Sequence, residues 1–344
     1  MSGKQSDRRL DAWVYGGGKG FGNCKPPDEL LHSDIKVPGD ALTETYAYMI
    51  YVPEERISSI IHFWLHPNLN VITAGPMVYQ GHKANQLCCE IFDIRAYHDA
   101  SGLGDGSDMT FASGHRIEIL EPFKKIRIRY DDADRGNSLD VVLTSAAPPV
   151  MRENNKHFEQ ICRSQGTLRL RGKSYVIDSF AVRDRSWGEL RQESPYPLPP
   201  YTWMTAIFPS LRMYWQVSGH DDPELNPEWG SHFELRPEHV FKDGWIQRDG
   251  ELLRLKSLSK LTTRDPTTRR PMSHQLHFVD AHDREYQVAG EVVASVPWQA
   301  WPNMICYMCL TRWTWEGHEG FGDTQEVQWS DYVYTFRSDG SHCA

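Results

Sequence analysis

The sequence has little of what marks membrane, secreted and nucleic-acid-binding proteins. Its longest unbroken apolar run, residues 304–310, is far shorter than a membrane-spanning helix requires. The first 13 residues are polar and contain no apolar segment of the kind found in secretory signals. Lys and Arg total 37 against 46 Asp and Glu, a formal net charge of −9, whereas phosphate backbones are bound by clustered cations. We therefore expect no membrane span and no nucleic-acid partner.

Cysteine patterns and cofactor motifs are also sparse. The seven cysteines are odd in number and irregularly spaced, which favours reduced thiols and predicts a cytoplasmic protein. Cys306 and Cys309 lie three apart in an apolar segment, and no second pair completes a zinc site. Residues 16–22 are glycine-rich but fit no phosphate-loop pattern, and no G-x-S-x-G elbow for a nucleophilic serine occurs. The sequence therefore predicts no metal and no bound cofactor.

Aromatic residues are abundant instead. The chain of 344 residues has 12 Trp, 15 Tyr and 13 Phe, and hydrophobic residues make up 40% of it, which excludes a disordered protein. Trp is large and carries one polar N–H group. An excess of Trp therefore indicates either heavy cores or a cavity lined by aromatic rings.

Apolar and polar residues alternate along most of the chain, which predicts antiparallel β-strands. Helical periodicity is confined to two short segments, residues 26–31 and 157–163. Many short strands separated by turn residues are typical of sandwiches and barrels, so we expect an all-β fold. The expected strands and hairpins are 126–130 with 139–143, 168–171 with 175–177 around Gly172-Lys173, 245–255 around Asp249-Gly250, 276–293, 304–315 and 326–336.

A domain boundary is expected in residues 145–155, where Pro148-Pro149 is followed by polar residues. The chain is too long for one small core and fits two domains. We therefore expect an N-terminal β domain at residues 1–150 and a C-terminal β domain at residues 151–344.

The most informative segment is residues 180–208. On a strand, Phe180, Val182 and Asp184 share one face, and Arg183 lies on the other. If Phe180 and Val182 face the interior, Asp184 follows them, and a carboxylic acid among apolar groups can stay protonated and act as a general acid. The alternative is that Asp184 caps a turn and pairs with Arg183.

The stretch Arg183–Gly188, with Arg191 after it, resembles the R-D-x-S-W-G-x-x-R signature of the AttH/carotenoid 1,2-hydratase-like superfamily. Residues 44–63 resemble the N-terminal aromatic hairpin of this superfamily, and residues 313–326 resemble its closing stretch. The resemblance spans roughly residues 40–335. It implies two lipocalin-like (calycin) antiparallel β-barrel or sandwich domains packed together.

The resemblance also implies a class of reaction. Members of the superfamily include hydratases that add water to an isolated isoprenoid double bond, and fungal relatives act as pericyclases on polyenes. It places the superfamily's carboxylate on Asp184 and its tryptophan on Trp187. Many relatives carry His where this chain has Arg185, which weakens the hydratase assignment if that His transfers a proton.

The candidate site combines acids, a cation and aromatic rings. Adding water to an alkene requires a proton donor and a surface that stabilises the resulting cation, as aromatic faces do. The acidic cluster of the closing stretch supplies a candidate base for water, although its glycine-rich surroundings suggest a loop of solvated carboxylates. Arg183 is expected to brace the sheet or pair with one of these acids. The candidate catalytic residues are Asp184, Arg183, Trp187, Glu326 and Asp323. The candidate substrate-binding residues are Trp64, Trp203, Trp215, Trp313, Trp315 and Phe180, and about half of the tryptophans are expected to be ordinary core.

Three hypotheses of function follow. The first is a cofactor-independent hydratase or related lyase acting on a hydrophobic alkene such as a terpenoid, with Asp184 as the acid. The second is a cyclase, pericyclase or isomerase in which the pocket folds a polyene. The third is a non-catalytic carrier of a hydrophobic ligand. All three expect a small hydrophobic molecule as partner, and the sequence leaves the oligomeric state open, a homo-oligomer included.

Overall fold

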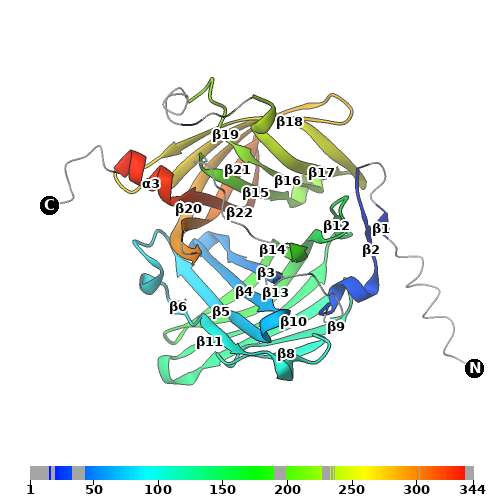
Figure 1. Cartoon of the computed structure of the whole chain (residues 1–344), viewed down its shortest axis with the longest axis vertical. Helices are drawn as coiled ribbons and strands as arrows, with labels where there is room; N and C mark the ends of the chain where they lie inside the picture. Colours follow the sequence, from blue (N-terminus) through cyan, green and yellow to red (C-terminus); the bar gives the residue numbers. More distant parts are fainter. Residues whose placement is uncertain are drawn as a thin grey trace, which may run out of the picture. The chain divides into compact units, whose positions relative to one another are not determined.

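The computed structural model describes residues 15–16, 20–32, 43–189, 199–226, 233, 235, 237–301 and 303–337. Nearly all of these residues lie in strands and the turns between them (Figure 1), which confirms the all-β prediction. Two compact units divide the chain. The first is made of Met1–Val52, Ser59–Val78 and Glu90–Arg191, and the second of Pro53–Ser58, Tyr79–Cys89 and Gln192–Ala344.

The first unit is built on one large antiparallel sheet. Its strand order is β6-β5-β4-β3-β14-β13-β11-β10-β9-β8, with β7 added beside β5 and β12 beside β13. A separate short ladder joins β1 to β2. The strands are β1 (Tyr15–Gly16), β2 (Asn23–Cys24), β3 (Thr43–Val52), β4 (Ile57–His66), β5 (Val71–Gln80), β6 (Ile91–Phe92), β7 (Arg95–Asp99), β8 (Asp108–Thr110), β9 (Arg116–Glu121), β10 (Lys125–Asp132), β11 (Asn137–Ser145), β12 (Val150–Met151), β13 (His157–Leu170) and β14 (Lys173–Glu189).

The second unit is a closed barrel of eight antiparallel strands, each paired with the next along the chain, with β22 returning to β15. A short helix, α3 (Ser330–Arg337), follows the last strand. The strands are β15 (Tyr201–Phe208), β16 (Met213–His220), β17 (Phe241–Arg248), β18 (Glu251–Arg264), β19 (Pro271–Asp280), β20 (Glu285–Trp301), β21 (Met304–Trp315) and β22 (His318–Trp329).

Short 3-10 helices make most of the remaining regular structure in the connections of the described chain. They are η1 (Pro26–Glu29), η2 (Pro53–Glu55), η3 (Pro67–Leu69), η4 (Gln86–Cys88), η5 (Ser101–Leu103), η6 (Ala133–Arg135), η7 (Pro209–Leu211) and η8 (Pro237–His239). The helix expected in residues 26–31 corresponds to η1.

The domain boundary expected near residue 150 lies too early in the chain. β13 and β14 follow that point, yet they belong to the first unit, where β14 pairs with both β13 and β3. The proline-rich segment that suggested a boundary is only the connection from β11 through β12 to β13. The composition shift marks a connection between strands of one unit, and the division of the two units follows β14 instead.

The predicted hairpins are present. Ile128 of β10 pairs with Val141 of β11, and the tight turn between β17 and β18 is Asp249-Gly250. Both turn residues have positive φ, 53° and 84°, as a two-residue turn that matches the strand twist requires. The turn between β13 and β14 is Arg171-Gly172, one residue earlier than expected, because Leu170 pairs with Lys173.

Two elements differ from the sequence-based expectation. Residues 157–163 begin the 14-residue strand β13 and do not form a helical turn. Residues 326–336, expected as the last strand, are divided between the end of β22 and the helix α3. In β13 the pairing with β14 decides the backbone conformation, and a short window of sequence contains too few residues to reveal it.

The interior of the second unit's barrel is filled by two layers of side chains. One end holds an apolar cluster that includes three tryptophans. Beyond this cluster, Lys260 and Arg264 of β18 contact Asp221 and Glu326 in a buried ionic network. The apolar cluster is Met204, Ala206, Phe208, Met213, Trp215, Val217, Ile246, Leu255, Leu258, Leu276, Phe278, Tyr286, Val288, Trp313 and Trp315.

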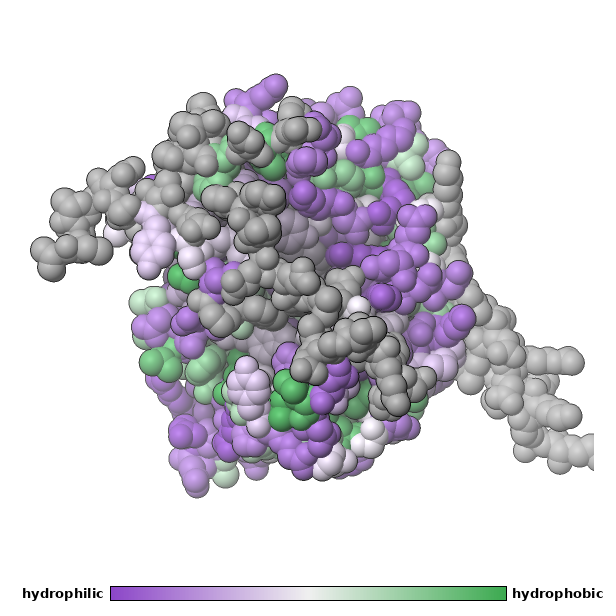
Figure 2. Space-filling model, in the orientation of Figure 1, coloured by the Kyte–Doolittle hydropathy of each residue, from purple (hydrophilic) through white to green (hydrophobic). Residues whose placement is uncertain are grey.

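The coloured part of the face shown in Figure 2 is mostly hydrophilic. In Figure 2 hydrophilic residues cover much of the coloured face, and hydrophobic residues form smaller patches between them. Among the residues described, no helix has the length and apolar character needed to cross a membrane.

Candidate active site

The motif strand β14 carries its charged residues on two faces. Arg183 and Arg185 are buried, 1% and 0% exposed, and share a face with Trp187, whereas Asp184 points to the opposite face with Phe180 and Val182. Trp187 belongs to an apolar cluster with Cys24, Phe123, Met151 and Phe158. On the face of Asp184, Val182 is 0% exposed and Phe180 is partly exposed, so this part of β14 is largely buried on both faces.

Arg183 owes its burial to an ion pair with Glu29 of η1. Its Nη2 lies 2.7 Å from Glu29 Oε2, and its Nε donates to Gln160 Oε1 at 2.9 Å. Burial lowers the pKa of Arg183, but the carboxylate of Glu29 outweighs this effect and raises it. The backbone N–H of Phe123 also donates to Glu29, at 2.8 Å. The partner of Arg183 is thus Glu29, and the pairing expected with the C-terminal acidic cluster is not found.

Arg185 fixes the segment around η1 to the motif strand. Its guanidinium donates to the carbonyl of Asp28 at 2.7 Å and pairs with the carboxylate of Glu44. The same group lies 3.8 Å from the ring centroid of Tyr46. The position at which many relatives are expected to carry His thus holds a structural arginine in this chain.

A histidine does lie next to the motif, although it comes from another segment. The ring of His32 stacks on Trp187 with 4.3 Å between centroids, and its Nδ1 lies 3.2 Å from Glu44 Oε1. Burial lowers the pKa of His32, but hydrogen bonds to Asp28 and Glu44 raise it above the ordinary value overall.

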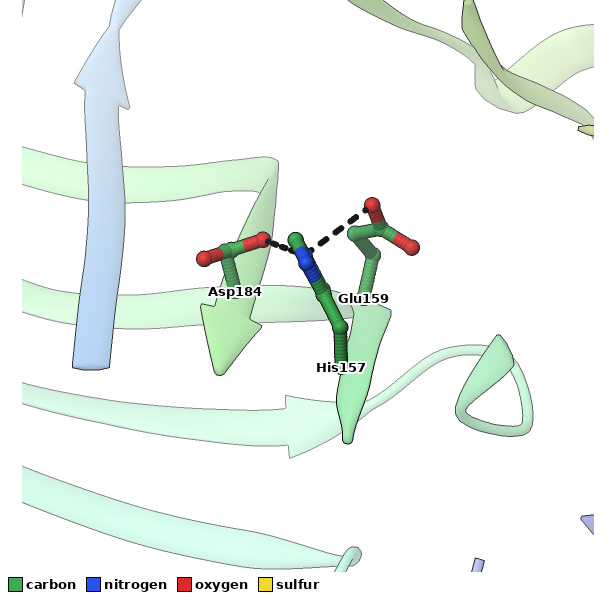
Figure 3. A group of neighbouring side chains, drawn as sticks. All are labelled: His157, Glu159 and Asp184. Atoms are coloured by element: carbon green, nitrogen blue, oxygen red, sulfur yellow. Dashed lines mark hydrogen bonds and ion pairs between the residues drawn. The ribbon is translucent and has the colours of Figure 1, made fainter. Parts of the chain in front are cut away.

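Asp184 lies in a cluster of titratable side chains on the other face of the sheet (Figure 3). Glu159 of β13 is its direct cross-strand partner, and His157 lies two residues before Glu159 on the same face. His157 Nε2 hydrogen-bonds Asp184 Oδ2 and lies 3.3 Å from Glu159 Oε1. Arg152 completes the group, with its Nη2 3.1 Å from Glu159 Oε1.

The charges in this cluster balance and keep a proton on His157. Burial and the nearby Arg152 lower the pKa of His157, but the carboxylates of Asp184 and Glu159 outweigh both and raise it to about 9. Burial raises the pKa of Glu159, whereas Arg152 and His157 lower it below its usual range overall. At neutral pH the cluster thus holds an imidazolium between two carboxylates, with Arg152 on the far side.

Solvent reaches part of this cluster. The side chains of Asp184 and His157 are 18% and 14% exposed, whereas Glu159 is fully buried. The hydrogen bond between Asp184 and His157 is thus partly open to water, whereas Glu159 is enclosed between His157 and Arg152.

The same three side chains are the group in the described chain that offers metal donors. One donor atom each from His157, Glu159 and Asp184 lies within 4.8 Å of the others. A divalent cation would have to displace the proton of His157 and compete with Arg152 for Glu159. The chemistry of the donor set fits a cation poorly, and the prediction of no metal stays a prediction.

Asp323 and Glu326 do not form a solvated loop. Both are buried in β22, where Asp323 and Glu326 lie on opposite faces. Arg264 binds Glu326 with two hydrogen bonds, of 2.8 and 2.9 Å, inside the barrel of the second unit. Gln325 donates to Asp323 at 2.7 Å. The expected grouping of the two as one acidic cluster is therefore wrong, and a catalytic part for either stays a prediction.

The expected aromatic lining is divided between the two units. Trp215, Trp313 and Trp315 pack inside the barrel of the second unit. Trp203 lies on the opposite face of β15 from this cluster, and Trp64 of β4 contacts His62 at 4.0 Å between ring centroids. Phe180 is partly exposed. At least three of the predicted substrate-binding tryptophans are thus core residues.

The sequence reasoning missed His157, Glu159 and Arg152. The alternation His157-x-Glu159 puts both side chains on one strand face, and Asp184 is their cross-strand neighbour. That signal existed in the sequence, but the expectation of a helical turn at residues 157–163 concealed it.

A family model described as a domain of unknown function (DUF7064) matches residues 25–331. The chain belongs to this family. The sequence of this DUF7064 protein matches no curated protein.

Solved structures show the fold that this DUF7064 protein shares. An AttH-like protein (NE1406) from Nitrosomonas europaea is similar with a TM-score of 0.62 at 13% identity, over 91% of this chain and 98% of that one. Kievitone hydratase from Nectria haematococca has a TM-score of 0.52 at 12% identity, over 85% of this chain and 90% of that one. CghA has a TM-score of 0.51 at 12% identity, over 85% and 89%. The predicted resemblance to the AttH/carotenoid hydratase-like superfamily and its two lipocalin-like domains is confirmed at the level of the fold.

Proposed function

We propose that this protein is a cofactor-independent proton-transfer enzyme of the hydro-lyase class that acts on a hydrophobic small molecule. The observation that carries the proposal is the protonated His157 held between Asp184 and Glu159 at a position that solvent reaches. A structural neighbour is named a hydratase, which agrees with this class of reaction.

The cluster supplies an acid and a base side by side. In the elimination direction, Asp184 takes the proton of a C–H bond and His157 gives its proton to the departing hydroxyl group. The C–H and C–O bonds break, a double bond forms, and water leaves. Hydration is the reverse. Glu159 and Arg152 hold the imidazole in place and contact no reacting atom.

The pKa of His157 limits the kind of substrate double bond that the cluster can form or hydrate. An acid with a pKa of about 9 donates too weakly to make an unactivated hydroxyl group leave as water, which formation of an isolated alkene would require. A double bond conjugated with a carbonyl group demands less of the acid, since the carbonyl stabilises the developing negative charge. We therefore favour an activated alkene over the isolated isoprenoid double bond expected from the sequence.

The experiment uses hydrophobic enones such as chalcone, and the matching β-hydroxyketones, in deuterated water. Turnover with deuterium incorporation is expected for the wild type and is followed by mass spectrometry. Asp184→Asn and His157→Gln are expected to reduce kcat by at least about 100-fold, the usual contribution of a general acid or base.

Asp178→Asn is the matched control, because Asp178 lies on the same strand in an exposed pair with Arg163. It is expected to keep full activity. Undiminished turnover in Asp184→Asn contradicts the proposed chemistry. A wild type that binds these compounds but converts none of them supports the carrier hypothesis instead, and conversion without deuterium incorporation supports a cyclase.

A further inference from the structure

The second unit has a cavity of about 830 Å³ at one end of its barrel. This volume lies within the range of about 300–1,000 Å³ typical of small-molecule sites. The lining comes from η4 and the two residues before it, the connection from β18 to β19, the facing ends of β20, β21 and β22, and α3. All of these segments belong to the second unit, so the cavity is complete within it.

The strand register identifies this cavity as the mouth of the barrel. Ile305 and Tyr307 of β21 share a strand face with Trp313, which lies in the interior apolar cluster. Ile305 pairs with Gln328 and Tyr307 with Glu326 on β22. The inner face thus leads from the apolar cluster through the ionic network to the cavity. The network closes the inner end, so an occupant of the mouth reaches no deeper.

The chemistry of the lining favours an uncharged, mainly apolar occupant. Pro297, Met304, Ile305, Tyr307 and Val333 supply apolar surface, and none of the described lining residues carries a charge. Two apolar side chains stand exposed at the cavity, Leu87 at 79% and Tyr334 at 74%. Here they adjoin the apolar lining of a hollow, and contiguous apolar surface of this kind is found at ligand-binding grooves.

Gln328 adds a specific polar requirement. Its side chain is buried at the cavity, and Nε2 donates to the carbonyl of Arg269 at 2.7 Å and to Glu326 Oε1 at 2.8 Å. Both partners are acceptors, which fixes the orientation of the amide group. The other amide atom, Oε1, is buried with no hydrogen-bond partner. A buried acceptor without a partner favours a ligand that brings a donor.

We propose that the barrel mouth of the second unit binds an uncharged apolar small molecule that carries a hydroxyl group. The hydroxyl donates to Gln328 Oε1, and the apolar body lies against Ile305, Tyr307 and the exposed side chains of Leu87 and Tyr334. This site is separate from the proposed chemistry at Asp184 and does not depend on it.

The test uses three probes of one carbon skeleton. Farnesol has the hydroxyl donor, farnesyl methyl ether lacks it, and farnesoate carries a negative charge. Titration calorimetry on the full chain is expected to show binding of farnesol. The affinity for the ether is expected to be about fivefold lower, because the buried acceptor Gln328 Oε1 loses its donor. The affinity for the anion is expected to be lower still. Gln328→Met is expected to remove the difference between farnesol and its ether.

Substitutions of Leu87 and Tyr334, the exposed side chains at the rim of the cavity, test where farnesol binds. They are not expected to destabilise the fold, because both side chains are exposed. Leu87→Ser with Tyr334→Ser is expected to weaken farnesol about tenfold, whereas Leu69→Ser, an exposed leucine of the first unit, leaves it unchanged. Equal binding to the rim variant and the wild type overturns the proposal. A second outcome also overturns the proposal. If the double variant binds farnesol normally but changes the oligomeric state seen by sedimentation, the barrel mouth is a contact surface for a second copy of the chain.

Discussion

The buried pair of Arg183 and Glu29 shows how one residue determines the stability of the motif strand. Removing one member leaves the other charge buried without a partner, which typically costs about 3–5 kcal/mol. We expect Glu29→Gln to lower the free energy of unfolding by this amount in urea titrations. Asp178→Asn breaks an exposed pair on the same strand and is expected to cost less than about 1 kcal/mol. Equal effects of the two substitutions would contradict the structural part assigned to Arg183.

A second prediction at this scale concerns the proton of His157. Activity that needs the imidazolium is expected to hold through neutral pH and to fall as the pH rises through about 9, where His157 deprotonates in the folded protein. The ratio kcat/KM, measured from pH 6 to 10, checks this because it reports the ionisation of the free enzyme. A falling limb centred near pH 6.5, the ordinary value for His, would mean that Asp184 and Glu159 do not hold the proton.

At the scale of elements, cross-strand packing of Trp313 depends on glycine. Gly290 of β20 is its direct partner, and a Cβ atom there would lie 2.5 Å from Trp313 Cζ3. We expect Gly290→Ala to destabilise the protein by about 1–3 kcal/mol through overpacking, as measured by thermal and urea unfolding. Combining it with Trp313→Leu is expected to cost less than the sum of the two. Ala289→Ser, on the exposed face beside it, is the control. Strict additivity would show that the two side chains do not meet.

The elements that the sequence predicts well are those with a local cause. The hairpin of β17 and β18 follows from alternation and from Asp249-Gly250, whose left-handed backbone suits those residues. The first residues of β13 were not predicted as strand. This segment begins with the polar residues His157 and Glu159 on one face, so it lacks the apolar alternation that indicates a strand. The helix α3 was read as strand because its aromatic residues favour either structure.

The candidate site was predicted in part. The motif identified Asp184, but the direction it faces depends on whether an arginine can be buried, and Glu29, 154 residues away, decides that. Likewise, Asp323 and Glu326 are three apart in sequence and lie on opposite strand faces. Pairings between distant segments are not visible in residue spacing, so the companions of Asp184 could be found only from the fold.

At the scale of the whole molecule, three buried histidines set an acid limit on stability. Burial lowers the pKa of His115 and His274 to about 3 and that of His220 to about 4. Below pH 6.5 the unfolded chain binds these protons and the folded protein does not. The free energy of unfolding is therefore expected to fall from pH 6.5 to about 4, by up to about 1.4 kcal/mol per pH unit for each histidine.

His157 affects the free energy of unfolding in the opposite direction and over a more alkaline pH range. Its folded pKa of about 9 lies above the ordinary value, so its contribution is complete below pH 6.5 and is lost as the pH rises through 9. Urea unfolding between pH 4 and 10 is expected to show a maximum between these limbs. His157→Gln should flatten the alkaline limb and leave the acid limb in place. An acid limb that begins only below pH 4 would show that carboxylates, and not the buried histidines, control it.

The order of strands in the first unit has a consequence for synthesis. β3 is the first long strand of that sheet, yet one of its neighbours is β14, the last; Thr45 and Ser186, hydrogen-bonded across this seam, are 141 residues apart. Until residue 189 has left the ribosome, one long edge of β3 has no strand to bind. A nascent or truncated chain ending near residue 150 would display that edge to other chains, an arrangement that promotes aggregation.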